Sequence, residues 1–492
     1  MSAGEQMGQE ALGRRPELSF GEVLDATGAA PLAGERERRL GGVSTDSRTL
    51  GPDELFVALS GERHDGNAFA LDAVARGARA LLLRGAPGDP ATDTLVAEVR
   101  RVSGGAAAVA VVVDPLRALA DLARWRRGRF RGPVIGVTGS SGKTSTKETL
   151  ATLLGEVALV AKSPASFNNA IGVPRTLLDA RADAEVLVLE IGTNHHGEIA
   201  ALCEIAQPTD AIVTGIGHAH LEGLGSQDGI AREKGALPAS LPPGGVCVLP
   251  HDDKYRDELA ARTAARVVTF GERDGADVVA AGAWLHAEGT SFLLRGPLIG
   301  AERQVTVPLL GGHAARNVAA ALAMGAALGH PLERLLAGLP RLAAARGRLQ
   351  RLSAGGVTFL DDSYNANPDS VRAGLAVLRS LPARRRIFVF GGMLELGASS
   401  ERLHCDLGEA VASAADILVT VGDLPRPTAL GARAAGLGEH QLVEARNVDE
   451  AVGALTALVA PGDVVLVKAS RAARLERVAE ALLGAIHARR GA

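Results

Sequence analysis

Short apolar runs alternate with longer stretches of helical periodicity through most of this chain. Between residues 133 and 343, buried strands are predicted at 134–137, 185–190, 211–214 and 246–249, with helices between them. This strand–helix alternation is typical of a parallel sheet covered by helices. Gly and Pro turns across 266–310 predict added antiparallel strands, and an Ala-rich helix is predicted at 314–328.

The region from residue 18 to 132 has shorter apolar runs, and it is predicted to form a smaller α/β domain. Its main apolar runs lie at 53–59 and 78–84. A stretch rich in Gly, Pro and Asp at 85–94 predicts a surface loop. The Arg-rich segment 117–131 has helical periodicity, and such a charge run is typical of a solvated helix face.

The last region, 344–492, repeats the strand–helix alternation. Its strands are predicted at 357–361, 387–390, 417–421 and 464–467, with helices between them. This order predicts a Rossmann-like, doubly wound sheet. The sequence therefore predicts an α/β protein of three domains, with residues 18–132, 133–343 and 344–492 as their bounds.

Composition narrows the function classes. The net charge of −3 and the aromatic content of 3% argue against nucleic-acid binding by bulk charge or by base stacking. No apolar run reaches the ~18 residues that span a bilayer, and residues 1–17 read as a polar, disordered tail without a signal peptide. Three separated cysteines exclude a disulfide framework, so a cytoplasmic protein is expected.

The strongest chemical motif follows the strand at 134–137 and opens a helix predicted to run to Leu154. Residues 138–144 read Thr-Gly-Ser-Ser-Gly-Lys-Thr, and backbone N–H groups of such a loop attract phosphate. Lys143 can reach the β- and γ-phosphates, and the Thr144 hydroxyl can bind Mg²⁺. The spacing departs from the standard phosphate loop, because Val137 stands where a glycine is usual. A purely structural Gly-rich turn is the weaker interpretation.

Polar side chains also follow the neighbouring strands. Glu190 ends the strand at 185–190, where α/β sheets bind ligands, and it is a candidate Mg²⁺ ligand. A strand-end Glu is structural as often when it stands alone, but the phosphate loop upstream favours the metal role. Lys234 lies in a helix predicted at 226–240, and the pattern alone favours an exposed lysine there. Four histidines that spacing does not rank follow these strands: His195, His196, His218 and His220.

From about residue 18 onward, the chain resembles the Mur ligases. The matching segments are 44–48 with 55–61, 138–148, 167–174, 190–199, 219–225, 361–368, 393–397 and 467–471. Two of them, Phe-Asn-Asn-Ala-Ile-Gly-Val-Pro and Asp-Asp-Ser-Tyr-Asn-Ala-Asn-Pro, mark one branch of the family. The resemblance implies that this branch adds D-alanyl-D-alanine to UDP-N-acetylmuramoyl-tripeptide for peptidoglycan synthesis and cell division.

The resemblance further implies an ATP-dependent ligase that forms an amide bond through an acyl phosphate. It implies ATP and Mg²⁺ as requirements, and a monomer in the cytoplasm. Two alternatives stay open: a sibling ligase that adds another amino acid, and a nucleotide-gated switch. Amide ligases of the folylpolyglutamate type share the phosphate-loop architecture, but a folate substrate would not explain the motifs of the first domain.

The resemblance also assigns residues by position. The ATP site would comprise Gly139, Ser140, Ser141, Gly142, Lys143, Thr144, Ser145, Asn317, Arg348 and Asp362. The substrate side would comprise Ser44, Thr45, Asp46, Ser47, Arg48, His64, Asp65, Asn168, Asn169, Tyr364, Asn365 and Asn367. Thr144, Glu190 and His220 would hold Mg²⁺, together with Lys234 as a carbamate. The catalytic residues would be Lys143, Lys234, His220 and Glu190.

The composition favours the carbamate assignment of Lys234, because only six of the 53 basic residues are lysines. An arginine cannot form the carbamate, so a lysine retained here is consistent with that role. Three positions depart from the family pattern: Ala314 replaces the usual Asn, Gly392 the usual Asp, and Ala469 the usual Gly. These departures predict altered positioning of the nucleotide rather than a different reaction.

Overall fold

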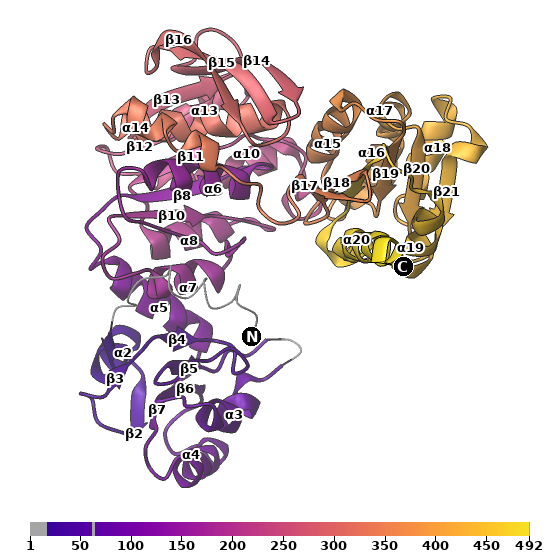
Figure 1. Ribbon diagram of the computed structural model, residues 1–492. Coiled ribbons are helices and arrows are strands. Elements are labelled where there is room, and N and C mark those ends of the chain that lie inside the picture. The colour runs from indigo at the N-terminus through magenta and orange to yellow at the C-terminus, as the bar shows by residue number, and fades with distance from the viewer. Residues whose placement is uncertain (1–16, 62–63, 492) are drawn as a thin grey trace. The chain divides into compact units, whose positions relative to one another are not determined.

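The computed structural model describes residues 17–61 and 64–491 (Figure 1). The tail predicted at 1–17 lies outside this part of the chain, apart from its last residue. The described chain divides into two compact units. The first holds the residues up to Gly136 with 158–193 and 197–210, and the second holds 137–157, 194–196 and 211–492. No helix in the described ranges is long and apolar enough to cross a membrane.

A five-stranded sheet forms the core of the first unit. Its order is β2 (Ala30–Ala33), β7 (Ala108–Val112), β6 (Ala80–Arg84), β5 (Leu55–Val57) and β4 (Val43–Ser44). All neighbours are parallel except β2 and β7. Strands β6 and β7 are apolar on both faces because both faces are buried. The other elements here are β1 (Leu18–Ser19), α2 (Phe20–Thr27), β3 (Arg39–Leu40), α3 (Ala70–Ala75), α4 (Pro90–Val102) and α5 (Pro115–Arg127).

The loop predicted at 85–94 is wrong in its second half, because helix α4 begins at Pro90. Asp89 is the N-cap, and its carboxylate accepts the backbone N–H of Thr92 at 3.0 Å. Pro90 occupies the first helical turn, where its missing N–H costs no helical hydrogen bond. The Gly, Pro and Asp that suggested a loop are therefore the start signal of a helix.

The arginines of α5 are not a purely solvated face, contrary to the sequence-based expectation. Arg127 donates from Nε to the carbonyl of Ala206 and from Nη2 to that of Gln207, both at 2.8 Å. Arg124 donates to the carbonyl of Glu204 at 3.2 Å. These carbonyls end helix α8 (Glu198–Ala206) and lack helical partners, so the guanidinium groups cap that helix.

Strands β8 to β16 form one nine-stranded sheet. In the first unit, β9 (Val160–Lys162) and β10 (Val186–Glu190) pair in parallel beside helix α7 (Gly172–Asp179). Strand β8 (Val134–Thr138) leads to the phosphate-loop motif. These bounds agree with the strands predicted at 134–137 and 185–190.

In the second unit, β11 (Asp210–Val213), β12 (Val246–Pro250), β13 (Arg266–Gly271) and β14 (Val278–His286) run parallel. Strands β15 (Gly289–Gly296) and β16 (Gly300–Val307) continue antiparallel, as predicted for 266–310. The prediction is wrong for β13, which lies in the same region and pairs in parallel with both of its neighbours. Helix α6 (Lys143–Leu154) packs against α13 (Gly312–Ala327). The helix predicted at 226–240 is divided into α10 (Gln227–Lys234) and α11 (Ala236–Ala239). Short helices complete this part: α9 (Leu221–Leu224), α12 (Arg256–Ala260) and α14 (Leu332–Leu336).

The C-terminal part of the second unit is a doubly wound sheet, as predicted (Figure 1, orange to yellow). Its strand order is β17 (Gln350–Ala354), β18 (Val357–Asp362), β22 (Val464–Lys468), β19 (Arg386–Phe390), β20 (Ile417–Val421) and β21 (Leu442–Ala445). Only the β17–β18 pair is antiparallel. One apolar core involves α15 (Pro368–Ser380), α17 (Gly408–Ala414) and α18 (Arg426–Ala434), next to α16 (Ser400–Asp406). The core on the other face involves α19 (Val448–Leu458) and α20 (Glu476–Gly491).

Replacing Arg127 with Met is expected to destabilise the end of α8. The change removes charge-assisted hydrogen bonds worth about 1.5–3 kcal/mol, so hydrogen exchange in the last turn of α8 should become faster. Arg117→Met is the control, because the side chain of Arg117 is 81% exposed and its contact with Asp121 is long, with Nε 3.8 Å from Oδ2. Equal exchange rates in wild type and Arg127→Met would contradict the capping role.

Candidate functional site

The segment between β8 and α6 folds as the sequence predicts for a phosphate loop. Gly139 has a φ of +146°, and a Cβ placed there would lie 1.9 Å from Oγ1 of Thr214. Only glycine allows this close approach. Helix α6 begins at Lys143, whose Nζ donates to the carbonyl of Gly139 at 2.8 Å. The N-terminal N–H groups of α6 and the lysine thus face the same loop.

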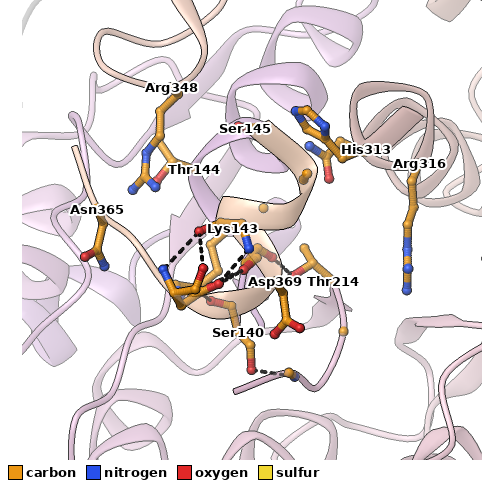
Figure 2. A pocket seen from close by; sticks show the side chains of 18 of the residues that line it. Ser140, Lys143, Thr144, Ser145, Thr214, His313, Arg316, Arg348, Asn365 and Asp369 are labelled. Atoms are coloured by element: carbon orange, nitrogen blue, oxygen red, sulfur yellow. Dashed lines mark hydrogen bonds between the residues drawn. The ribbon is translucent and has the colours of Figure 1, made fainter. Parts of the chain in front are cut away.

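A cavity of about 430 Å³ opens over this loop (Figure 2). Its volume falls in the range of sites for small molecules. All of its lining residues belong to the second unit. The lining brings together these residues of the predicted site: Ser140, Ser141, Gly142, Lys143, Thr144, Ser145, His220, Asn317, Arg348, Asp362, Asn365 and Asn367.

The start of helix α15 contacts the phosphate loop. The side chain of Asn367 caps α15 by accepting the N–H of Ser370 at 2.9 Å. Its Nδ2 donates to Oγ of Ser141 at 3.0 Å and to the carbonyl of Ser140 at 3.3 Å. One amide side chain therefore fixes both the helix and the loop.

Several cavity residues were not predicted from the sequence, among them Thr214, Asp253, Arg316, Asp369 and Lys468. Asp369 accepts the N–H of His218 at 2.8 Å, and its other oxygen lies 3.3 Å from Nδ1 of the same histidine. The hydroxyl of Thr214 donates to the carbonyl of Ser141 at 2.5 Å. Asp369 also occupies the first turn of α15, where acidic residues are common for helix stability, so the pattern carried no distinct signal.

Of the four candidate histidines, His220 is the one that lines the described cavity. Its Nδ1 lies 2.5 Å from Oε2 of Glu395, a residue that the sequence analysis did not select. Burial lowers the pKa of His220, whereas the hydrogen bond to Glu395 acts in the opposite direction. The carboxylate fixes the ring, as carboxylates do for histidines whose other nitrogen binds a metal ion.

Lys234 is fully buried, contrary to the exposed helix lysine that the pattern favours. Its Nζ has no hydrogen-bond partner among the described residues. Burial lowers the pKa of this amine well below its ordinary value, and the charge of Lys143 lowers it further. Lys234 does not line the cavity itself. A neutral, unpartnered amine is the form that reacts with carbon dioxide.

Asn317 lies on α13 beside the phosphate loop. Its Oδ1 accepts the hydroxyl of Thr146 at 3.2 Å. Ala314, which replaces the usual Asn, is 4% exposed on the same helix. It lines a smaller pocket next to the main cavity, where an amide would offer polar atoms that alanine lacks.

Tyr364 lies between two arginines. The guanidinium of Arg348 is 4.2 Å from the centre of its ring, and that of Arg471 is 5.4 Å from it. Cation–π contacts of this kind restrain a flexible arginine. Tyr364 itself does not line the cavity, whereas Arg348, which it contacts, does.

The predicted sugar-nucleotide residues lie in the first unit. Arg48 donates to both carboxylate oxygens of Asp46, and this hydrogen bonding lowers the pKa of Asp46 to about 2. Oγ of Ser44 donates to the carbonyl of Asp46 at 3.0 Å, and Thr45 lies 3.4 Å from Arg175. Ser47 is buried, His64 is exposed, and Asp65 accepts the hydroxyl of Ser60 at 3.0 Å.

The first unit also brings Asn168 and Glu190 together. Nδ2 of Asn168 donates to Oε1 of Glu190 at 2.9 Å, and Glu190 is 1% exposed. Asn169 instead accepts the N–H groups of Ile171 and Gly172 and so stabilises the start of α7. Of the two neighbouring asparagines, Asn168 is therefore the one that orients the carboxylate.

Comparisons with known proteins agree with this arrangement. Three family models match successive parts of the chain. They are the Mur ligase family catalytic domain at residues 39–127, the Mur ligase middle domain at 137–325, and the Mur ligase glutamate ligase domain at 347–471. The chain belongs to the Mur ligase family.

Individual members of the family match over nearly the full length. The UDP-N-acetylmuramoyl-tripeptide–D-alanyl-D-alanine ligase of Mycobacterium bovis is 36% identical over 95% of this chain and 98% of its own. A crystal structure of MurF from Acinetobacter baumannii has a TM-score of 0.84 at 31% identity. The match covers 96% of this chain and 100% of the MurF chain. MurF from Thermotoga maritima, solved in complex with ADP, has a TM-score of 0.76 at 29% identity, covering 91% and 98%.

Replacing Lys143 with Met is expected to weaken the binding of Mg²⁺–ATP to this Mur ligase by about ten-fold or more, since a charge-assisted contact to phosphate is lost. Isothermal titration measures the Kd. Arg303→Met is the control, because Arg303 pairs with Glu333 and does not line the cavity. An unchanged Kd in Lys143→Met would contradict the phosphate-binding role.

Proposed function

We propose that this Mur ligase joins D-alanyl-D-alanine to UDP-N-acetylmuramoyl-tripeptide with the cleavage of ATP to ADP and phosphate. The product is the UDP-N-acetylmuramoyl-pentapeptide precursor of peptidoglycan. The full-length similarity to ligases named for this reaction carries the proposal, and the phosphate-loop cavity supports it.

The chemistry explains why a nucleotide site is needed. A carboxylate is a poor electrophile, so its direct union with an amine in water is slow and unfavourable. In the proposed reaction, the tripeptide carboxylate attacks the γ-phosphate, ADP leaves, and an acyl phosphate forms. The amine of D-alanyl-D-alanine then attacks the acyl carbon, loses a proton, and expels phosphate. The first step brings two anions together, so neutralisation of charge dominates its barrier.

The cavity residues fit that requirement. Lys143 and the N–H groups at the start of α6 are assigned to the phosphates, with Gly139, Ser140, Ser141, Gly142, Thr144 and Ser145. Asn317, Arg348 and Asp362 are assigned to the rest of the nucleotide. Asn365 and Asn367 line the same cavity, and we assign them to the substrate group that meets the phosphates. Tyr364 supports this wall through its contact with Arg348.

The acceptor side is assigned to the first unit. Ser44, Thr45, Asp46, Ser47 and Arg48 form a polar turn that we assign to the UDP end of the sugar nucleotide, with His64 and Asp65. Asn168 and Asn169 are assigned to the muramoyl-peptide. The domain bounds at residues 18–132, 133–343 and 344–492 belong to the same proposal, as does action in the cytoplasm.

Mg²⁺ is the cation that we assign to Thr144, Glu190 and His220. The described residues contain no group of three or more His, Cys, Asp or Glu side chains arranged for a metal ion. The buried, unpartnered amine of Lys234 would add a metal-binding group to the assigned set, because a carbamate on it would supply carboxylate-like oxygens. Oxygen ligands suit Mg²⁺, which would supply positive charge to the phosphates when bound.

The closest alternative is a sibling ligase that adds a single amino acid, and the amine requirement separates the two. With ATP and UDP-N-acetylmuramoyl-tripeptide, D-alanyl-D-alanine is expected to raise phosphate release by about ten-fold or more over single amino acids, because the extra residue adds binding energy at the transition state. The panel holds L-alanine, D-alanine, D-glutamate and a diamino acid. Stimulation by the diamino acid would favour the sibling, and ATP hydrolysis that ignores every acceptor would favour a nucleotide-gated switch.

Lys234→Ala is expected to be inactive and to regain part of its activity with acetate or formate, which replace the lost carboxylate-like group. Lys254→Ala is the control, because Lys254 is exposed and does not itself line the cavity, although its Nζ donates to the cavity residue Gln227 at 2.8 Å. With ¹³C-labelled bicarbonate, a carbamate signal should appear in wild type and in the control but not in Lys234→Ala. Full activity of Lys234→Ala without added carboxylate would remove the carbamate from the proposal.

A further inference from the structure

A buried ion pair in the wall of the cavity joins Asp362, which is assigned to the nucleotide, to Lys468, which has no assigned role so far. Lys468 ends β22, Asp362 ends β18, and the two residues are direct partners on these parallel strands. Nζ of Lys468 lies 2.5 Å from Oδ2 of Asp362. The two side chains are 2% and 12% exposed. Because burying two charges costs solvation, such a pair is weak evidence for stability and calls for another function.

The second oxygen of Asp362 holds a backbone turn. Oδ1 accepts the N–H of Leu349 at 3.2 Å. Leu349 has a φ of +55°, which is unfavourable for a residue with a branched side chain. The turn therefore needs an external contact to keep this conformation, and the carboxylate supplies it.

The same turn is held from its other end. Gly347 has a φ of +68°, and its carbonyl accepts the N–H of Tyr364 at 3.1 Å. Arg348, the residue between the two left-handed positions, lines the cavity (Figure 2). Its guanidinium rests over the ring of Tyr364. The direction of the Arg348 side chain thus follows from the conformation of residues 347–349.

We propose that Lys468 and Asp362 are positioning residues for Arg348. Lys468 holds the carboxylate, the carboxylate holds the Leu349 turn, and the turn aims the guanidinium into the nucleotide cavity. Nζ of Lys468 also donates to the carbonyl of Asn365 at 3.1 Å, which ties a second cavity residue to the same ammonium. This inference rests on the proposed binding of ATP, and it adds a role through Arg348 to the assignment of Asp362 to the nucleotide.

A double-mutant cycle tests the inference on the full chain. Lys468→Met and Arg348→Ala are each expected to weaken the binding of Mg²⁺–ATP by about ten-fold, the scale of one lost charge-assisted contact. The double variant should bind no more weakly than Arg348→Ala alone, because both changes remove the same contact. Titration of the four proteins measures the coupling.

The Arg385–Asp463 pair is the matched control. Asp463 is fully buried just before β22, and Arg385 donates to it at 2.6 Å, at the opposite end of the strand from Lys468. Arg385→Met is expected to lower the melting temperature and leave the Kd for Mg²⁺–ATP unchanged. If Lys468→Met fails to fold, the pair Asp362→Asn with Lys468→Met removes both charges together and leaves no unpaired buried charge.

Three results would overturn the inference. One is that the double variant raises the Kd for Mg²⁺–ATP by the product of the two single effects of Lys468→Met and Arg348→Ala. Another is that Lys468→Met, like the control, changes only the melting temperature. The third is that the loss in Lys468→Met disappears when 2′-deoxy-ATP replaces ATP, which would indicate a direct ribose contact by Asp362. A wild-type protein that binds no Mg²⁺–ATP would instead refute the proposed function.

Discussion

The proposed site depends on one constraint. The phosphates of a nucleotide carry concentrated negative charge, and groups on one short loop must balance it. Backbone N–H groups at the start of α6 and the ammonium of Lys143 are the positive groups that we assign to that charge. The loop can close only because Gly139 has no side chain where Thr214 approaches. Because these donors are fixed before a ligand arrives, little reorganisation is needed when charge develops during phosphoryl transfer.

Two buried lysines show how the surroundings of one residue type decide its chemistry. Lys468 faces a carboxylate and stays paired, so it fixes the backbone that aims Arg348. Lys234 has no partner among the described residues, and burial favours its neutral amine. Lys468 is suited to fixing a backbone conformation, whereas Lys234 is suited to forming a carbamate. An arginine could not replace Lys234, because its guanidinium stays protonated.

The C-terminal part of the second unit contributes to the wall of the cavity together with the phosphate loop. Asn367 contacts the loop, Asp369 holds His218, and Glu395 holds the ring of His220. Each of these side chains is separated from its partner by more than a hundred residues of sequence. The cavity therefore exists only where distant segments meet.

The sequence by itself determined the main buried strands of the two larger sheets and the phosphate loop, since apolar runs and glycine spacing reflect local requirements of the backbone, and its motifs indicated the family. It did not predict β7, β9, β17 or β21. It did not determine that Pro90 starts a helix, that Arg127 caps α8, or that Lys234 is buried. Nor did it identify Glu395, Asp369 or Lys468, whose roles depend on what lies opposite them. Only the tertiary structure decided these points, because burial and hydrogen-bond partners are properties of residues brought together across the chain and leave no local pattern.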